Sequence, residues 1–107
     1  GATLIPAVPG YSIKPLRYFI KSTGNFSSGG GTNMLIQDNN TNPVVVTTVD
    51  KAALTNGAKI SSEVTVSKVT DGEGMLSALT KGKALIVRGA SFGGGTSVTI
   101  SIDYMLV

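Results

Sequence analysis

Hydrophobic and polar residues alternate most regularly over residues 96–107 (TSVTISIDYMLV). A period of two is typical of a β-strand, because successive side chains of a pleated strand point to opposite faces. One face is expected to carry the apolar side chains, at Val98, Ile100, Ile102, Tyr104 and Leu106. The other face carries hydroxyl and carboxylate groups, with Met105 as the exception. This pattern predicts a long, half-buried strand.

Shorter segments predict further strands, at residues 11–21, 32–38, 44–49, 59–69 and 83–88. Turn residues such as Asn56-Gly57 separate them. Pro15 is expected to place the first half of residues 11–21 at a sheet edge or a bulge. Helical candidates are short: one turn at residues 50–54, capped by Asp50, and residues 73–79.

Strands at intervals of about 8–15 residues, without regular strand–helix alternation, predict an all-β fold with an antiparallel, jelly-roll-like β-sandwich. Residues 1–10 contain Pro6 and Pro9, which remove backbone donors, so they are expected to form an extended N-terminal arm. Residues 11–107 are expected to form a single sandwich domain. Its core is predicted at Leu16, Tyr18, Ile20, Leu35, Val64, Val66, Leu85, Val87, Val98, Ile100, Ile102 and Tyr104.

The composition favours assembly. Charged residues make up 14% of the 107 residues, against about 25% in an average soluble domain, and the mean hydropathy is +0.24. Few charges then oppose association with neighbouring molecules. The alternative is a monomer with a neutral surface of Ser, Thr, Asn and Gly.

The sequence offers little catalytic chemistry. It contains neither Cys nor His, which excludes thiolate metal sites, Cys nucleophiles and His-based relays. Asp71 and Glu73 lack a third carboxylate nearby for calcium, and residues 93–97 (GGGTS) lack the Lys of a phosphate-binding loop. We therefore expect no catalytic, metal or cofactor-binding residues, no cofactor and no enzymatic activity.

The charge pattern and the apolar runs bear on partners. The net charge is +3, and apart from Tyr18 and Phe19 the basic residues are not interleaved with stacking aromatics, so no nucleic-acid partner is expected. No apolar run is long enough to span a bilayer, so no membrane partner is expected.

Two glycine-rich segments resemble each other. Residues 25–38 and 91–103 each contain a Phe, a glycine triplet, a Thr and an alternating strand. They are either related hairpin ends or a coincidence in a chain with 14 glycines. If they are related, Phe26 and Phe92 are expected at exposed loop tips, packed against a neighbouring molecule.

Three short motifs carry a family resemblance. They are Val8-Pro9-Gly10 before a basic strand, KGKAL at residues 81–85, and Asp103-Tyr104 in the last strand. With these motifs the chain resembles small jelly-roll proteins of tailed bacteriophages, which are capsid cement or decoration proteins or modules of head and tail fibres. The resemblance implies a structural role with no catalytic residues to carry over.

The function expected from this resemblance is that of a virion protein that is made in the host cytoplasm and binds the capsid surface. Its partners would be the major capsid protein and further copies of itself, with a homotrimer favoured. The alternative is a fibre module that binds a receptor or a carbohydrate. Interface residues are expected at Leu4, Ile5 and Val8 of the arm, with Lys14 and Arg17 at its rim, besides Phe26 and Phe92. Leu4 and Ile5 could instead complete an edge of the domain's own sheet.

Overall fold

The strands follow one another with little other regular structure. The computed structural model describes residues 2–26, 32–89 and 96–107. In these residues it contains β1 (Ala2–Ile5), β2 (Ile13–Thr23), β3 (Asn33–Asp38), β4 (Val45–Asp50), the 3-10 turn η1 (Lys51–Ala53), β5 (Lys59–Ser61), β6 (Val69–Asp71), β7 (Leu85–Gly89) and β8 (Ser97–Leu106).

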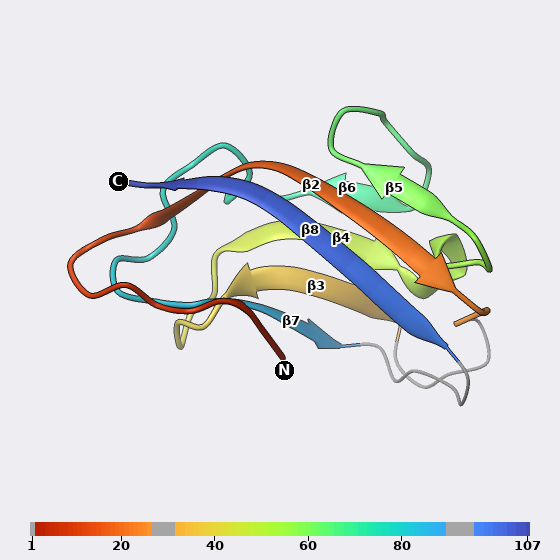
Figure 1. The fold of residues 1–107 in the computed structure, drawn as a ribbon, viewed down its shortest axis with the longest axis horizontal. Helices are drawn as coiled ribbons and strands as arrows, with labels where there is room; N and C mark the ends of the chain where they lie inside the picture. The colour runs from red at the N-terminus through yellow and green to blue at the C-terminus, as the bar shows by residue number, and fades with distance from the viewer. Residues whose placement is uncertain (1, 27–31, 90–95) are drawn as a thin grey trace.

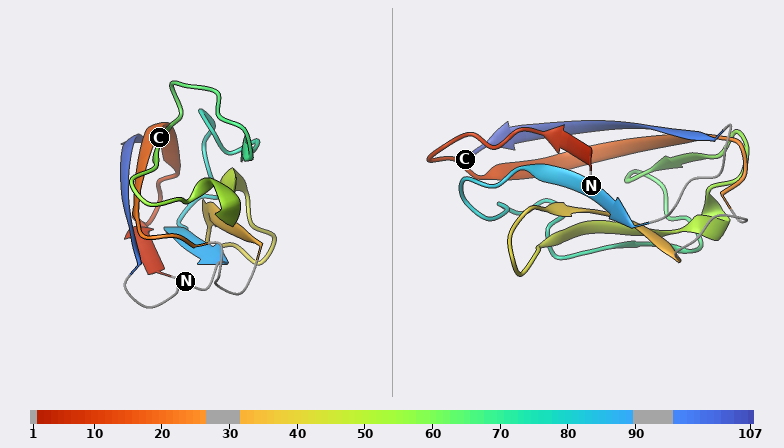
Figure 2. Two further views of the ribbon diagram at one scale, coloured as in Figure 1. Left: turned by 90° about the vertical axis from the view of Figure 1, so that its right-hand side faces the viewer. Right: turned by 90° about the horizontal axis from the view of Figure 1, so that it is seen from below.

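Two antiparallel sheets pack face to face, which confirms the predicted β-sandwich. One sheet has the strand order β1-β7-β3-β4-β6 and the other has the order β5-β2-β8. Figure 2 shows the two layers edge-on. In the three-stranded sheet, β2 and β8 run side by side along the long axis of the molecule (Figure 1).

The core lies between the two sheets. Its buried apolar side chains are Ile5, Ile13, Tyr18, Ile20, Phe26, Met34, Ile36, Val46, Val49, Leu54, Ile60, Leu79 and Leu85, with Ile86 also buried. The predicted core members Tyr18, Ile20 and Leu85 are among them. Five others lie outside the core: Val64 is 63% exposed, Tyr104 is 44% exposed, and three half-buried side chains do not join the core cluster, namely Leu16, Leu35 and Val66. Val64 lies outside any strand, and Tyr104 lies on the edge strand β8, where one side has no neighbouring strand to cover it.

Two predicted features of β2 are confirmed, the burial of Tyr18 with Ile20 and the irregularity at Pro15. Tyr18 and Ile20 point into the core, while Phe19 and Lys21 are exposed on the opposite face. The register with β8 shifts between Pro15 and Arg17, which is the irregularity expected at that proline.

Residues 59–69 do not form the single strand that their alternation predicts. Only Lys59–Ser61 forms β5, and the chain then turns, with the Ser61 hydroxyl accepting a hydrogen bond from the Glu63 N–H at 3.0 Å. Lys68 has a positive φ of 69°, which no regular strand contains. A side-chain hydroxyl that accepts a hydrogen bond from a nearby backbone N–H competes with strand pairing for that N–H. The alternation of polar and apolar residues gives no sign of this competition.

The two helical candidates have different outcomes. The Asp50 carboxylate accepts a hydrogen bond from the Ala52 N–H at 2.9 Å and caps η1, as predicted. Residues 73–79 form turns rather than a helix. Their backbone instead bonds to β2, with the Leu76 N–H donating to the Pro15 carbonyl and the Leu79 N–H donating to the Ile13 carbonyl.

A buried carboxylate holds the turns at one end of the sandwich. Asp38 is fully buried and accepts hydrogen bonds from the N–H groups of Asn40, Val44 and Thr80 and from the Thr80 hydroxyl. Burial by itself would raise the pKa of Asp38, but the hydrogen bonds from Thr80, Val44 and Asn40 outweigh it and hold the pKa below its usual value. The carboxylate therefore stabilises the fold as an anion.

A buried tyrosine connects the two sheets. The Tyr18 hydroxyl on β2 donates a hydrogen bond to Asp71 Oδ1 at 2.5 Å, and it accepts one from the Thr47 hydroxyl on β4 at 3.3 Å. Burial raises the pKa of Tyr18 to about 12, and the hydrogen bond to Asp71 adds to this effect. The neutral phenol is thus favoured in the folded state.

Replacing Tyr18 by Phe tests this connection. We expect Tyr18→Phe to lower the free energy of unfolding at neutral pH by about 1 kcal/mol, since it removes hydrogen bonds but keeps the ring. Because the folded pKa of Tyr18 lies above the ordinary value of 10.0, its contribution is present below pH 10 and is lost between pH 10 and about 12. Denaturant titrations across this pH range should show the free energies of unfolding of the wild type and of Tyr18→Phe becoming equal. A constant difference up to pH 12 would contradict the assignment.

Candidate interaction face on the three-stranded sheet

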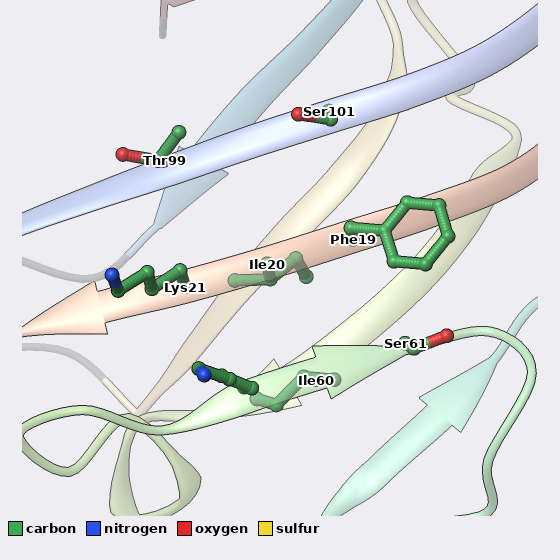
Figure 3. A pocket seen from close by; sticks show the side chains of 8 residues that line it. Phe19, Ile20, Lys21, Ile60, Ser61, Thr99 and Ser101 are labelled. Carbon is green, nitrogen blue, oxygen red and sulfur yellow. The ribbon is translucent and has the colours of Figure 1, made fainter.

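The outer face of the sheet β5-β2-β8 centres on an exposed aromatic ring. Phe19 of β2 is 46% exposed, and its cross-strand neighbours are Ser61 of β5 and Ser101 of β8. Figure 3 shows the ring on the strand surface between these two hydroxyl side chains. An aromatic ring at this position is available for contact with another molecule.

Two lysines lie in the next row of the same face. Lys21 of β2 pairs with Lys59 of β5 on one side and with Thr99 of β8 on the other. Like charges directly opposite each other weaken a sheet. In the part of the chain that the structure describes, neither lysine forms a salt bridge. The pair therefore concentrates uncompensated positive charge beside Phe19.

These rows border a shallow hollow of about 260 Å³. Its lining combines an aromatic ring, two ammonium groups, three hydroxyls and the strand backbone, from Phe19, Ile20, Lys21, Lys59, Ile60, Ser61, Thr99 and Ser101 (Figure 3). Such a surface can attract an anionic group, donate and accept hydrogen bonds, and cover an apolar surface.

The row on the other side of Phe19 is electrically balanced. Arg17 Nε lies 3.0 Å from Asp103 Oδ2, and both side chains are about half exposed, at 54% and 53%. Such an exposed pair contributes about 0–1 kcal/mol to stability. Arg17 neutralises the charge of Asp103, so the uncompensated charge on this face is that of Lys21 and Lys59.

The arm residues expected at an interface belong largely to the domain itself. Ala2–Ile5 forms β1 and pairs with β7, so the alternative that these residues complete an edge of the domain's own sheet is observed. The expectation for Ile5 was wrong, because Ile5 is 6% exposed and part of the core. Leu4 is partly buried against that core, and Val8 is partly exposed between β1 and β2.

Phe26 is not an exposed loop tip. It is fully buried in the core, and its N–H donates to the Leu54 carbonyl at 3.2 Å. The glycines that follow it suggested an exposed loop, but a large ring is more stable when it is removed from water. Phe92 lies outside the described residues.

The two expected rim cations lie on β2. Lys14 is half-buried and pairs with Met105, and Arg17 is exposed and bound to Asp103. They share a strand with Phe19 and Lys21 but not with the arm residues that they were expected to accompany. Phe19, Lys21, Lys59, Thr99 and Ser101 were not singled out from the sequence. The alternation along residues 11–21 sets Phe19 and Lys21 on the face opposite Tyr18 and Ile20, and this is the signal in the sequence that points to them.

A second, smaller groove lies at the seam between the two sheets. It is lined by Leu4, Ile5 and Pro6 from the β1 region and by Ile100, Ile102 and Tyr104 of β8. The apolar side of β8 is therefore only partly covered by its own domain.

Neither a metal-binding cluster nor a membrane-spanning helix is found among the described residues. Among residues 2–26, 32–89 and 96–107, no group of three or more carboxylates is placed to hold a metal ion. The described part of the chain also has no helix of the length and apolar character needed to cross a membrane. No family model, curated protein or solved structure matches the chain.

Proposed function

We propose that the chain is a structural protein of a virus particle, a capsid cement or decoration protein that binds the capsid surface and associates with further copies of itself. The bacteriophage resemblance of its sequence suggests the particle. The observation that carries the proposal of docking is the exposed Phe19 beside the uncompensated Lys21 and Lys59 on a sheet face. The jelly-roll arrangement expected from the resemblance remains part of this proposal.

The chemistry of this face defines its partner. Two adjacent ammonium groups that lack carboxylates of their own favour an acidic surface, because binding would relieve their mutual repulsion. The Phe19 ring can be covered by an apolar side chain, and aromatic anchors of this kind often dominate the affinity of an interface. A folded acidic patch on a capsid subunit would supply both contacts.

Charge reversal tests the docking face. Lys21→Glu combined with Lys59→Glu is expected to weaken cosedimentation with capsids of the encoding virus roughly tenfold or more, since attraction becomes repulsion. The matched control is Lys81→Glu with Lys83→Glu, which makes the same charge change at exposed residues on either side of Gly82, whose N–H donates to the Tyr11 carbonyl ahead of β2. Equal binding by the two double variants would contradict the proposal.

The second candidate is a carbohydrate-binding fibre module. The observation that favours it is the group of hydroxyls around Phe19, from Ser61, Thr99 and Ser101, because sugar rings stack on aromatic faces and bond to hydroxyls. Titration of the isolated protein with neutral oligosaccharides distinguishes the candidates. A saturable response that Phe19→Ala removes and the lysine reversals leave intact would favour the carbohydrate function.

A further inference from the structure

Strand β8 has one long edge without a partner strand. In the sheet order β5-β2-β8 it pairs with β2 alone among the described residues. Val107 exchanges both backbone hydrogen bonds with Ser12. Because such hydrogen-bonded pairs alternate along an antiparallel pair of strands, this contact fixes which residues of β8 direct their backbone groups toward β2. The odd-numbered residues of β8 bond to β2, so the N–H and C=O groups of the even-numbered residues face outward, at Val98, Ile100, Ile102, Tyr104 and Leu106.

This edge lacks the usual protection against pairing. The other edge strands of the two sheets are short, with three residues in β5, three in β6 and four in β1, and Pro6 follows β1 directly. Strand β8 has ten residues and contains no proline or lysine, and the bulge at Pro15 lies on the β2 side. Natural proteins protect exposed edges with such residues, because an open edge is a template for another strand.

We propose that a second copy of this chain pairs with β8 through its own β8, antiparallel and about a twofold axis at Ile102. The inference deepens the self-association in the proposed function and rests on it. In this register Ile102 lies opposite its own copy, Ile100 opposite Tyr104, and Val98 opposite Leu106. The outward backbone groups from Val98 to Leu106 then all find partners.

The sequence of β8 complements itself in this register. Its apolar side chains form one continuous face across the two copies, and they cover Tyr104 and Leu106, which are 44% and 38% exposed in the single chain. On the outer face, Asp103 lies opposite Ser101 of the second copy, where a hydrogen bond is available.

Neighbouring registers are less favourable. A shift of two residues toward the C-terminus would place Asp103 opposite its own copy, and like charges directly opposite are destabilising. A shift of two residues the other way leaves Leu106 opposite Thr96, outside the strand.

In the register centred on Ile102, the groove beside Ile100 and Ile102 would receive side chains from the second copy along its length. These matches favour a second copy over a strand of unrelated sequence.

Introduced cysteines test the register, because the chain has none of its own. Thr99 and Met105 are both exposed, and they lie opposite each other between the two copies in a non-hydrogen-bonded pair, with Cα atoms about 4.5–5.5 Å apart. Within one chain they lie about 20 Å apart along the strand and are unable to link. Thr99→Cys with Met105→Cys is therefore expected to give a covalent dimer under mild oxidation.

The two single-cysteine variants are the controls, and both should remain monomeric on non-reducing gels. Cross-linking of a single variant to the same extent as the double variant, or none in either, overturns the register. If the double variant stays monomeric when pure but becomes cross-linked to a different protein in the particle, the partner of the β8 edge is not a second copy of this chain.

A second pair of variants tests the backbone contact. Tyr104→Pro removes an outward N–H that is not used in the sheet with β2, whereas Tyr104→Ala removes the side chain and keeps that N–H. We expect light scattering to give a mass near twice 10.9 kDa for the wild type and for Tyr104→Ala, and 10.9 kDa for Tyr104→Pro. A threefold mass, or a Tyr104→Pro variant that dimerises like the wild type, overturns the inference. Capsid docking through Lys21 and Lys59 is measured separately, so either proposal can fail alone.

Discussion

Replacing Asp38 by Ala is expected to lower the free energy of unfolding by about 3–5 kcal/mol. The substitution removes the acceptor of hydrogen bonds from Asn40, Val44 and Thr80, and these donors stay beside a fully buried position. Unsatisfied buried N–H groups are costly because they have given up water without gaining a partner. Denaturant unfolding followed by circular dichroism measures the effect.

The matched control is the exposed carboxylate of Glu73. Glu73→Ala should change stability by less than about 0.5 kcal/mol, because its side chain is solvated before and after unfolding. If Asp38→Ala were as mild as Glu73→Ala, the assigned hydrogen bonds would contribute little.

The same carboxylate gives the fold an acid dependence of known sign. The pKa of Asp38 in the folded state lies below its ordinary value of 3.8, so the unfolded chain binds a proton more readily than the folded one. The stabilisation is therefore present above about pH 4 and is lost as the pH falls through the folded pKa. Asp38→Asn should remove this part of the acid dependence. An unchanged acid profile in Asp38→Asn would assign the effect to other carboxylates.

Replacing Phe26 by Ala is expected to destabilise the fold by about 3–5 kcal/mol. The ring is fully buried, and its removal leaves a cavity in the core beside the segment of Leu54, whose carbonyl accepts the Phe26 N–H. Phe19→Ala is the matched control, since its ring is 46% exposed on the outer face. It should cost about 0.5 kcal/mol in stability while weakening capsid docking. Equal losses of stability in the two variants would mean that Phe26 is not a core residue.

Local patterns predicted much of the fold. The period of two in β8, the irregularity at Pro15 and the cap at Asp50 depend on neighbouring residues along the chain, and all three were found. The burial of Phe26 was missed because glycines near it in the sequence predict a loop. They carry no information about where the ring of Phe26 packs. The strand expected through Val64 ends at Ser61, where the Ser61 hydroxyl accepts a local hydrogen bond from the Glu63 N–H as the chain turns away from the sheet.

The interaction face could not be assembled from the sequence. Its two lysines are brought together by the pairing of β2 with β5, and Ser101 is brought to Phe19 by the pairing of β2 with β8. A shift of one residue in either register would place different side chains on this face. The packing of the whole domain fixes these strand registers. A single sequence therefore shows which residues form each strand, but it does not show which residues of other strands lie beside them.

The pairing of β2 with β8 joins segments from opposite ends of the chain. Arg17 and Asp103 are 86 residues apart in the chain, so β2 is synthesised long before its principal partner. Closing such a large loop costs entropy before any contact is gained, and folding on the order of milliseconds to seconds is typical of sheets with distant pairings. During that interval the apolar side of β2 is exposed, and its own Lys14, Pro15, Arg17 and Lys21 are the residues that oppose premature aggregation of the nascent chain.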